Sequence, residues 1–185
     1  MQYKLNPNAQ YPYDINTLSD FLRLRNVERV ETYLSLDSKA NLPYIKLNNI
    51  MDAVNKLDYH LKRESKIYIL FDEDVDGFTS GSAMFNYLIK LEPFCNLEYI
   101  LHKRAKAHGL SKHVIIPEDC DLLIIPDAST NDTEECKALS EREIDIIILD
   151  HHEREKENNY AIIVNNQISE DYENKNISGV GVEYK

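Results

Sequence analysis

The chain has 185 residues, 43% of them hydrophobic, which allows one domain with a buried core and is typical of a globular protein rather than a disordered one. Its net charge of −11 argues against a broad basic surface for gripping duplex nucleic acid, although clustered carboxylates would still suit a cation site. No apolar run approaches the roughly 20 residues of a membrane-spanning helix, and the three widely spaced cysteines, without a C-x-x-C pair, are typical of a reduced, cytoplasmic protein.

Two helices are predicted ahead of the first strand. Apolar residues recur at helical spacing from Asn16 to Tyr33, with Asn16 or Thr17 available as the cap, and again from Leu47 to Leu61. Residues 1–15 are rich in Asn, Tyr and Pro and show neither a helical nor a strand period. We therefore expect residues 1–46 to form an N-terminal arm and helix, and residues 47–185 to form the main domain.

Five short runs rich in branched apolar residues predict strands. They cover residues 66–71, 97–101, 122–125, 144–149 and 161–164, and helical patterns separate them at residues 80–91, 111–115 and 131–142. Alternating strands and helices predict an α/β domain with a parallel sheet of about five strands flanked by helices. Because the apolar runs are nearly continuous, we expect both faces of these strands to be buried.

Acidic residues and histidines follow three of the predicted strands. The first strand is followed by Asp72-Glu73-Asp74-Val75-Asp76-Gly77, the third by Asp127 and the fourth by Asp150-His151-His152. The carboxyl ends of parallel strands meet at one edge of a sheet, where ligands of such folds bind. Carboxylates and imidazoles are ligands of Mn²⁺, Mg²⁺ or, less selectively, Zn²⁺. The sequence therefore predicts a metal site at this edge.

The D-x-D-x-D-G run has competing interpretations. On an extended continuation of the strand, its three aspartates would point to one side, and Gly77 would permit a tight turn into a helix whose first amides, from Phe78 to Ser80, favour a phosphate. A solvated acidic turn without function is the alternative. An EF-hand is excluded, because it requires a preceding helix and a Glu six residues after the Gly, where this chain has Ala83.

A functional role is the better interpretation when Asp127 and the two histidines are considered together. An Asp after a strand often caps the next helix, but Thr130 or Asn131 is available for that task. Adjacent histidines at a strand end project in different directions, so His151 and His152 are not expected to share one niche in the core.

These residues resemble the first three motifs of the DHH phosphoesterases, and within that superfamily the RecJ-type single-strand nucleases, whose first motif reads D-x-D-x-D-G. The run His102–Ser111 is similar to the R-x-x-x-G-[HY]-G-L segment of RecJ proteins, except that Lys106 and Ala107 replace an acidic residue and a glycine. The run Ser178–Val182 is similar to their [SA]-G-x-G-V motif. The likeness extends from about Leu47 to the last residue.

The resemblance implies a 5′-to-3′ exonuclease on single-stranded DNA that uses two ions, Mn²⁺ or Mg²⁺. The family pattern places metal ligands at Asp74, Asp76, Asp127 and His151, with Asp127 bridging the ions and Asp72 supporting or completing the shell of the first. His152 is expected to face the scissile phosphate, and Asp150 to orient a histidine. Arg104, helped by Lys103 and Lys106, is expected to hold a backbone phosphate, although an exposed ion pair is an equal alternative for Arg104.

The chain also departs from the family pattern. Asn166 stands where the family's V-N-P segment has its Pro, and Lys185 follows the glycine motif closely, before the further metal-binding Asp and the second domain of RecJ-like proteins. A missing C-terminal domain or another chain is therefore expected to complete the site. The alternative functions are an oligoribonuclease, a cyclic-dinucleotide phosphodiesterase, or a catalytically incomplete module that binds metal or nucleic acid.

Overall fold

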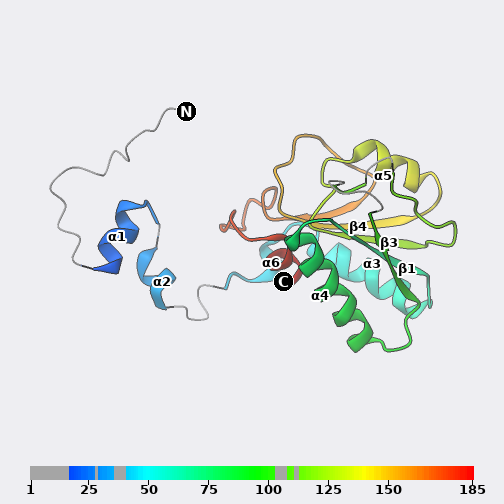
Figure 1. Ribbon diagram of the computed structural model, residues 1–185, viewed down its shortest axis with the longest axis horizontal. Coiled ribbons are helices and arrows are strands. Elements are labelled where there is room, and N and C mark those ends of the chain that lie inside the picture. Colours follow the sequence, from blue (N-terminus) through cyan, green and yellow to red (C-terminus); the bar gives the residue numbers. More distant parts are fainter. Residues whose placement is uncertain (1–16, 28, 36–40, 103–107, 111–112) are drawn as a thin grey trace. The chain divides into compact units, whose positions relative to one another are not determined.

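The computed structural model describes residues 17–27, 29–35, 41–102, 108–110 and 113–185 (Figure 1). The chain divides into two compact units, residues 1–42 and residues 43–185, and each is described by itself. Within the described residues, no helix combines the length and the apolar composition needed to cross a membrane.

Where the structure describes the smaller unit, two short helices replace the single helix predicted from Asn16 to Tyr33. Helix α1 spans Leu18–Leu24 and α2 spans Val30–Ser35. The predicted cap is confirmed at Thr17, whose side chain forms a capping box with Asp20. The prediction of a continuous helix was wrong because the backbone turns left-handed at Asn26 and Arg29, with φ of 57° and 54°. A left-handed residue ends a helix, and Asn tolerates this conformation better than most residues.

The larger unit is the predicted α/β fold. A five-stranded parallel sheet has the order β2-β1-β3-β4-β5. Its strands are β1 (Ile67–Phe71), β2 (Leu97–Leu101), β3 (Leu122–Pro126), β4 (Asp145–Asp150) and β5 (Ile162–Asn165). Its helices are the short 3-10 helix η2 (Tyr44–Lys46), α3 (Ile50–Lys62), α4 (Val75–Leu91), α5 (Thr133–Ser140) and α6 (Gly179–Glu183).

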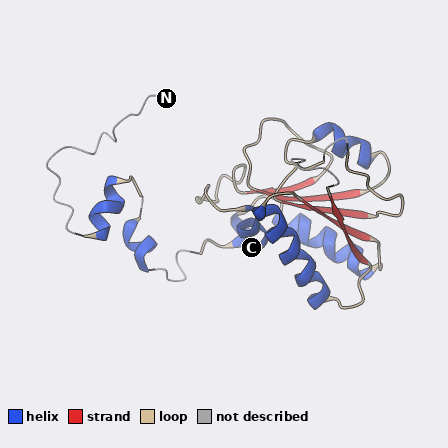
Figure 2. Cartoon of the chain, viewed as in Figure 1, coloured by secondary structure: helices blue, strands red, loops and turns tan. Residues whose placement is uncertain are grey.

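Helices cover both faces of the sheet. Helix α5 lies on one face, and α3, α4 and α6 lie on the other (Figures 1 and 2). Along β3, Leu123 and Ile125 pack into the core cluster on the α5 side, together with Cys136 of that helix. The intervening Ile124 lines an apolar cavity of about 590 Å³ between the sheet and the other three helices. This alternation explains why β3 is a continuous apolar run.

Two details of the predicted fold were wrong. Strand β2 is not buried on both faces: Glu98, Tyr99 and Leu101 are exposed, because β2 is the edge strand and no described strand pairs with its outer side. No helix forms at residues 113–115, the described part of the predicted helix at residues 111–115. The nearby Pro117 disfavours helical backbone at the residue before it.

The order of the strands determines where a ligand site should lie. From β1, the chain crosses to β2 on one side and then returns to β3 on the other side. In open parallel sheets, such a reversal leaves a crevice at the carboxyl ends of the two strands concerned. The loops after β1 and β3 begin with Asp72 and Asp127, so both carboxylates lie at the reversal point.

Candidate metal centre

Three buried carboxylates form the floor of the site. Asp72 follows β1, Asp127 follows β3 and Asp150 ends β4, and their exposed fractions are 2%, 1% and 1%. An ionised carboxylate is costly to bury unless hydrogen bonds or a cation compensate it. The three carboxylates differ in how far neighbouring groups compensate their charge, and they therefore suit different chemical roles.

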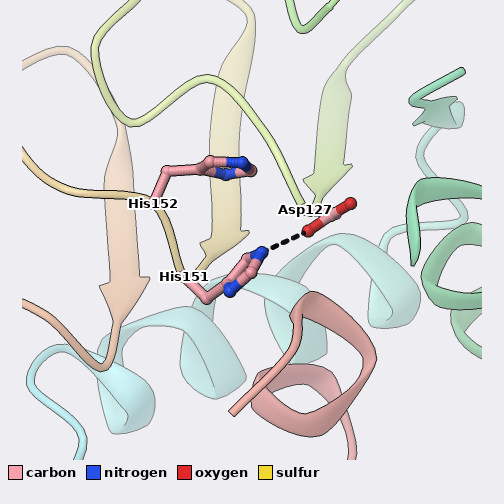
Figure 3. Close-up of side chains that lie close together, drawn as sticks. All are labelled: Asp127, His151 and His152. Atoms are coloured by element: carbon pink, nitrogen blue, oxygen red, sulfur yellow. Dashed lines mark ion pairs between the residues drawn. The ribbon is translucent and has the colours of Figure 1, made fainter. Parts of the chain in front are cut away.

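Asp127 is the least compensated of the three. The imidazole Nε2 of His151 lies 3.1 Å from its Oδ1 atom (Figure 3), yet that buried oxygen accepts no hydrogen bond from the described residues. Burial, reinforced by the neighbouring carboxylates of Asp76 and Asp74, raises the pKa of Asp127 to about 7. Its backbone is left-handed, with φ of 68°, an uncommon conformation for a non-glycine residue and one that recurs at functional sites.

Two groups of potential ligands share Asp127. One consists of Asp127, His151 and His152, and the other of Asp72, Asp74 and Asp127; within each group the ligand atoms lie within 4.8 Å of one another. Carboxylates and imidazoles in this combination suit a divalent cation such as Mn²⁺. A cation would also compensate the buried Asp127 oxygen, so the residues present fit such an ion.

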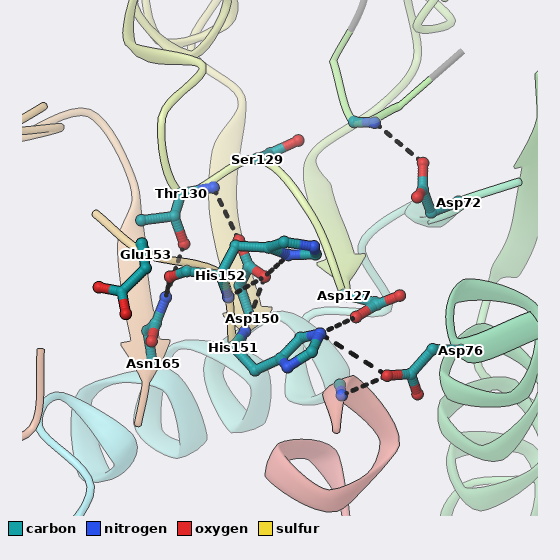
Figure 4. A network of polar contacts seen from close by, with 12 residues as sticks. Asp72, Asp76, Asp127, Ser129, Thr130, Asp150, His151, His152, Glu153 and Asn165 are labelled. Atoms are coloured by element: carbon teal, nitrogen blue, oxygen red, sulfur yellow. Dashed lines mark hydrogen bonds and ion pairs between the residues drawn. The ribbon is translucent and has the colours of Figure 1, made fainter. Parts of the chain in front are cut away.

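Asp150 is fully compensated by its neighbours. Its Oδ1 atom accepts hydrogen bonds from the backbone amides of His151 and His152, and its Oδ2 atom accepts one from Thr130 (Figure 4). The ring Nδ1 of His152 lies 2.7 Å from Oδ1. Against the effect of burial, the hydrogen bonds from His152 and Thr130 hold the pKa of Asp150 far below its usual range. The same contact raises the pKa of His152 to about 9.

The spacing of its aspartates suggested that the first motif continues the strand in an extended form. This prediction was wrong. Helix α4 begins at Val75, because the side chain of Asp74 caps it by accepting a hydrogen bond from the amide of Gly77, 2.9 Å away. Gly77 is therefore not a turn before the helix, and Phe78–Ser80 do not supply its first amides. A Cβ atom at Gly77 would lie 2.5 Å from the Cβ of Asp72, so glycine lets the helix pack against the strand end.

Asp76 joins the first motif to the glycine-rich motif near residue 180. Its two oxygens accept hydrogen bonds from the amides of Gly179, at 2.8 Å, and Val180, at 3.2 Å. Its Oδ2 atom lies 3.7 Å from Nε2 of His151 (Figure 4). A Cβ atom at Gly179 would lie 2.6 Å from Cγ of Asp127. The motif resemblance pointed to this segment, but only the structure places it against the site.

Asp72 contacts histidines that sequence reasoning had given no role. Its Oδ2 atom lies 2.5 Å from Nδ1 of His108, and its Oδ1 atom lies 3.5 Å from Nε2 of the buried His102. Although burial opposes it, the hydrogen bond with His108 lowers the pKa of Asp72. In turn, that hydrogen bond raises the pKa of His108. The similarity of residues 102–111 to a family segment was the available signal.

The structure locates only some of the remaining predicted residues. Arg104, Lys103 and Lys106 lie outside the described residues. As expected, Asp127 does not cap α5. The prediction that Thr130 or Asn131 caps this helix was wrong, because the N-cap is Asp132. Thr130 instead accepts a hydrogen bond from the buried Asn165, and Asn131 holds the loop after the histidines through the amides of residues 155 and 156.

Comparisons with known proteins relate the chain to a family. The model of the DHH family, N-terminal domain, matches residues 66–185. A putative SPbeta prophage-derived single-strand DNA-specific exonuclease YorK of Bacillus subtilis is 40% identical over 185 residues, covering 100% of this chain and 31% of the relative. The single-stranded-DNA-specific exonuclease RecJ of the same organism is 30% identical over 144 residues, covering 75% of this chain and 18% of RecJ.

The fold also occurs among solved structures. A crystal structure of exonuclease RecJ bound to manganese superimposes with a TM-score of 0.64 at 22% identity, covering 77% of this chain and 37% of the other. At this level of identity, the likeness concerns the fold. The present chain spans about a third of the length of YorK, so the activity of the whole relative does not transfer with the alignment.

Proposed function

The chain belongs to the DHH family, and on that premise we propose that it hydrolyses phosphodiester bonds of single-stranded DNA from the 5′ end, with bound Mn²⁺ or Mg²⁺. One observation carries the proposal: Asp127, whose buried Oδ1 atom accepts no hydrogen bond from the described residues, has potential metal ligands on two sides, His151 in one group and Asp74 in the other, at the point where the order of the strands reverses. Two ions that share one carboxylate are an arrangement typical of phosphodiester hydrolysis.

The proposed ligands are Asp74, Asp76, Asp127 and His151, with Asp127 between two ions. When bound, such ions supply a water molecule of lowered pKa and offset the charge on the phosphate. The Nε2 atom of His151 lies 3.1 Å from Oδ1 of Asp127, which supports a role for both residues in one ion site. Asp74 is close enough to Asp127 to support a second site.

His152 is proposed to face the scissile phosphate rather than a metal. Its Nδ1 atom is already engaged by Asp150, which fixes the direction of the ring. The same contact raises the pKa of His152 to about 9, and a protonated imidazole donates hydrogen bonds to phosphate oxygens. Asp150 therefore acts as a positioning residue.

Single-stranded DNA is proposed as the substrate because the YorK and RecJ relatives are described as single-strand DNA-specific exonucleases. The test compares a 5′-labelled single strand, a 3′-labelled single strand and a labelled dinucleotide, each with Mn²⁺. We expect mononucleotide release from the 5′ end of the long strand. Faster cleavage of the dinucleotide would instead favour a small-substrate phosphodiesterase and reject the proposed substrate.

Metal binding is tested separately from turnover. Calorimetry with Mn²⁺ should show binding to the wild-type chain and its loss in Asp127→Ala, because the bridging carboxylate contributes to both ion sites. Asp58→Asn, which removes an exposed carboxylate on α3, is the matched control and should bind like the wild type. Binding without cleavage would favour a non-catalytic DHH module. The further domain or second chain expected to complete the site stays a prediction.

A further inference from the structure

Asp72 directs both of its oxygens at the segment His108–Leu110. Its Oδ2 atom lies 2.5 Å from Nδ1 of His108, and its Oδ1 atom accepts a hydrogen bond of 2.9 Å from the amide of Gly109. Asp72 is near enough to Asp74 and Asp127 for a shared ion. However, its side chain is almost fully buried, and the two hydrogen bonds already compensate its charge, whereas Asp76, which also accepts two hydrogen bonds, keeps 25% of its side chain exposed. Asp127, in contrast, has an oxygen without such a partner.

The segment is also anchored from its other side. The amide of Leu110 donates to Oγ of Ser129, at 3.0 Å, and to Oδ2 of Asp132, at 2.9 Å. The side chain of Leu110 is buried in the core cluster on the α5 face. Gly109 has a φ of 57°, and a Cβ atom there would lie 2.5 Å from the Asp132 carboxylate. The backbone beside His108 is therefore held in one position by residues that follow both β1 and β3.

This anchoring places a third imidazole at the edge of the site. The ring of His108 stands edge-to-face against that of His152, with centroids 5.0 Å apart, and about half of its side chain is exposed. The rings of His151 and His152 are 4.6 Å apart, so the three imidazoles form a row that begins beside Asp127. The contact with Asp72 uses Nδ1 of His108 and leaves Nε2 for a partner from solution.

We propose that Asp72 is a positioning residue that holds His108, and that His108 contacts a phosphate group of the nucleic acid beside His152. The inference rests on the proposed function for the class of substrate. It reassigns Asp72 from the metal shell, where the sequence placed it, to the support of the substrate side. A short carboxylate–imidazole contact at Nδ1 is the usual way in which a histidine is oriented so that its other nitrogen meets a ligand.

Two binding measurements on the full chain test the inference without requiring turnover. The first is Mn²⁺ calorimetry on the wild type, Asp72→Asn and Asp74→Asn. The second is fluorescence anisotropy with a 3′-labelled single strand that carries a 5′ phosphate and hydrolysis-resistant phosphorothioate linkages. It uses His108→Ala, Asp72→Asn, the double variant and His113→Ala, an exposed histidine in the same region, as the matched control. Thermal unfolding of each variant shows whether it is folded.

We expect Asp72→Asn to lower Mn²⁺ affinity far less than Asp74→Asn does. We expect His108→Ala to weaken oligonucleotide binding about tenfold, as for the loss of one charge-assisted hydrogen bond. Asp72→Asn should weaken oligonucleotide binding to a similar extent. The double variant should be no weaker than His108→Ala, because two residues that act through one contact are not additive. His113→Ala should bind like the wild type.

The contrary outcomes are distinct. Equal losses of Mn²⁺ affinity in Asp72→Asn and Asp74→Asn would return Asp72 to the metal shell. Unchanged oligonucleotide binding in His108→Ala, while the wild type binds both Mn²⁺ and the strand, would overturn the role of His108 and leave the proposed function intact. A wild-type chain that binds neither Mn²⁺ nor the strand would overturn the proposed function and the inference together.

Discussion

Substituting Gly179 by Ala tests how closely α6 lies against the site. A Cβ atom at this position would lie 2.6 Å from Cγ and 2.7 Å from Cβ of Asp127. Neither atom belongs to a flexible chain end, because Asp127 is buried and its own amide is tied to the carbonyl of Leu149 at 2.7 Å. The added methyl group must therefore displace Asp127 or move α6, which also carries the two amides bound by Asp76.

The same helix provides a matched control. A Cβ atom at Gly181 would come no closer than 3.3 Å to another heavy atom, the Cβ of Ile177. Overpacking of a buried site costs about 1–3 kcal/mol, whereas Gly→Ala inside a helix stabilises by up to about 1 kcal/mol. We therefore expect Gly179→Ala to be about 1–4 kcal/mol less stable than Gly181→Ala.

The assays are urea unfolding and Mn²⁺ calorimetry on both variants. Besides its lower urea midpoint, Gly179→Ala should bind Mn²⁺ about 10- to 100-fold more weakly than the wild type, the usual effect of displacing a group around a metal ligand. Gly181→Ala should bind normally. Equal urea midpoints and equal Mn²⁺ affinities for the two variants would refute the placement of α6 against Asp127.

Three further predictions concern protonation, metal removal and the support behind the histidines. Because the pKa of Asp127 is raised to about 7 and a metal requires the ionised carboxylate, Mn²⁺ affinity should fall about tenfold per pH unit below 7; affinity that calorimetry finds constant between about pH 6 and 8 would contradict this. Mn²⁺ at about 100 times its dissociation constant should stabilise the wild type by about 2.7 kcal/mol in urea, and EDTA should remove the effect. Asn165→Ala should lower the free energy of unfolding by about 3 kcal/mol, because the buried Asn165 side chain forms hydrogen bonds with Thr130, the His152 carbonyl and the Gln167 amide. The exposed control Asn86→Ala should shift the urea midpoint little. Equal losses of stability in the two variants would argue against this network.

The sheet could be predicted from the sequence because its strands are apolar enough to identify locally. The runs that formed β1 and β3 had no competing interpretation, and the polar residues after them marked the edge where the site lies. The exposure of β2 could not be predicted in the same way. It depends on which strand ends the sheet, and that order is set by the crossovers rather than by the composition of residues 97–101.

The site was predictable where it depended on strand ends and not where it depended on distant segments. The start of α4 was misplaced because Asp74 was considered only as a ligand, although the same side chain caps the helix. The contacts of Asp72 with His108 and of Asp76 with Gly179 join residues that are 36 and 103 positions apart. No local period or propensity reports such contacts, so only the folded chain reveals them.

The bond from Asp76 to the amide of Gly179 has a consequence for biosynthesis. Asp72, Asp74, Asp127 and the two histidines are all translated before residue 179, yet Asp76 receives its amide partners only when the segment at residues 179–180 arrives. A ribosome-bound chain that ends earlier therefore carries these acidic groups without the helix whose amides bind Asp76. The timing of synthesis thus delays the contacts of Asp76 until nearly all of residues 43–180 have been made.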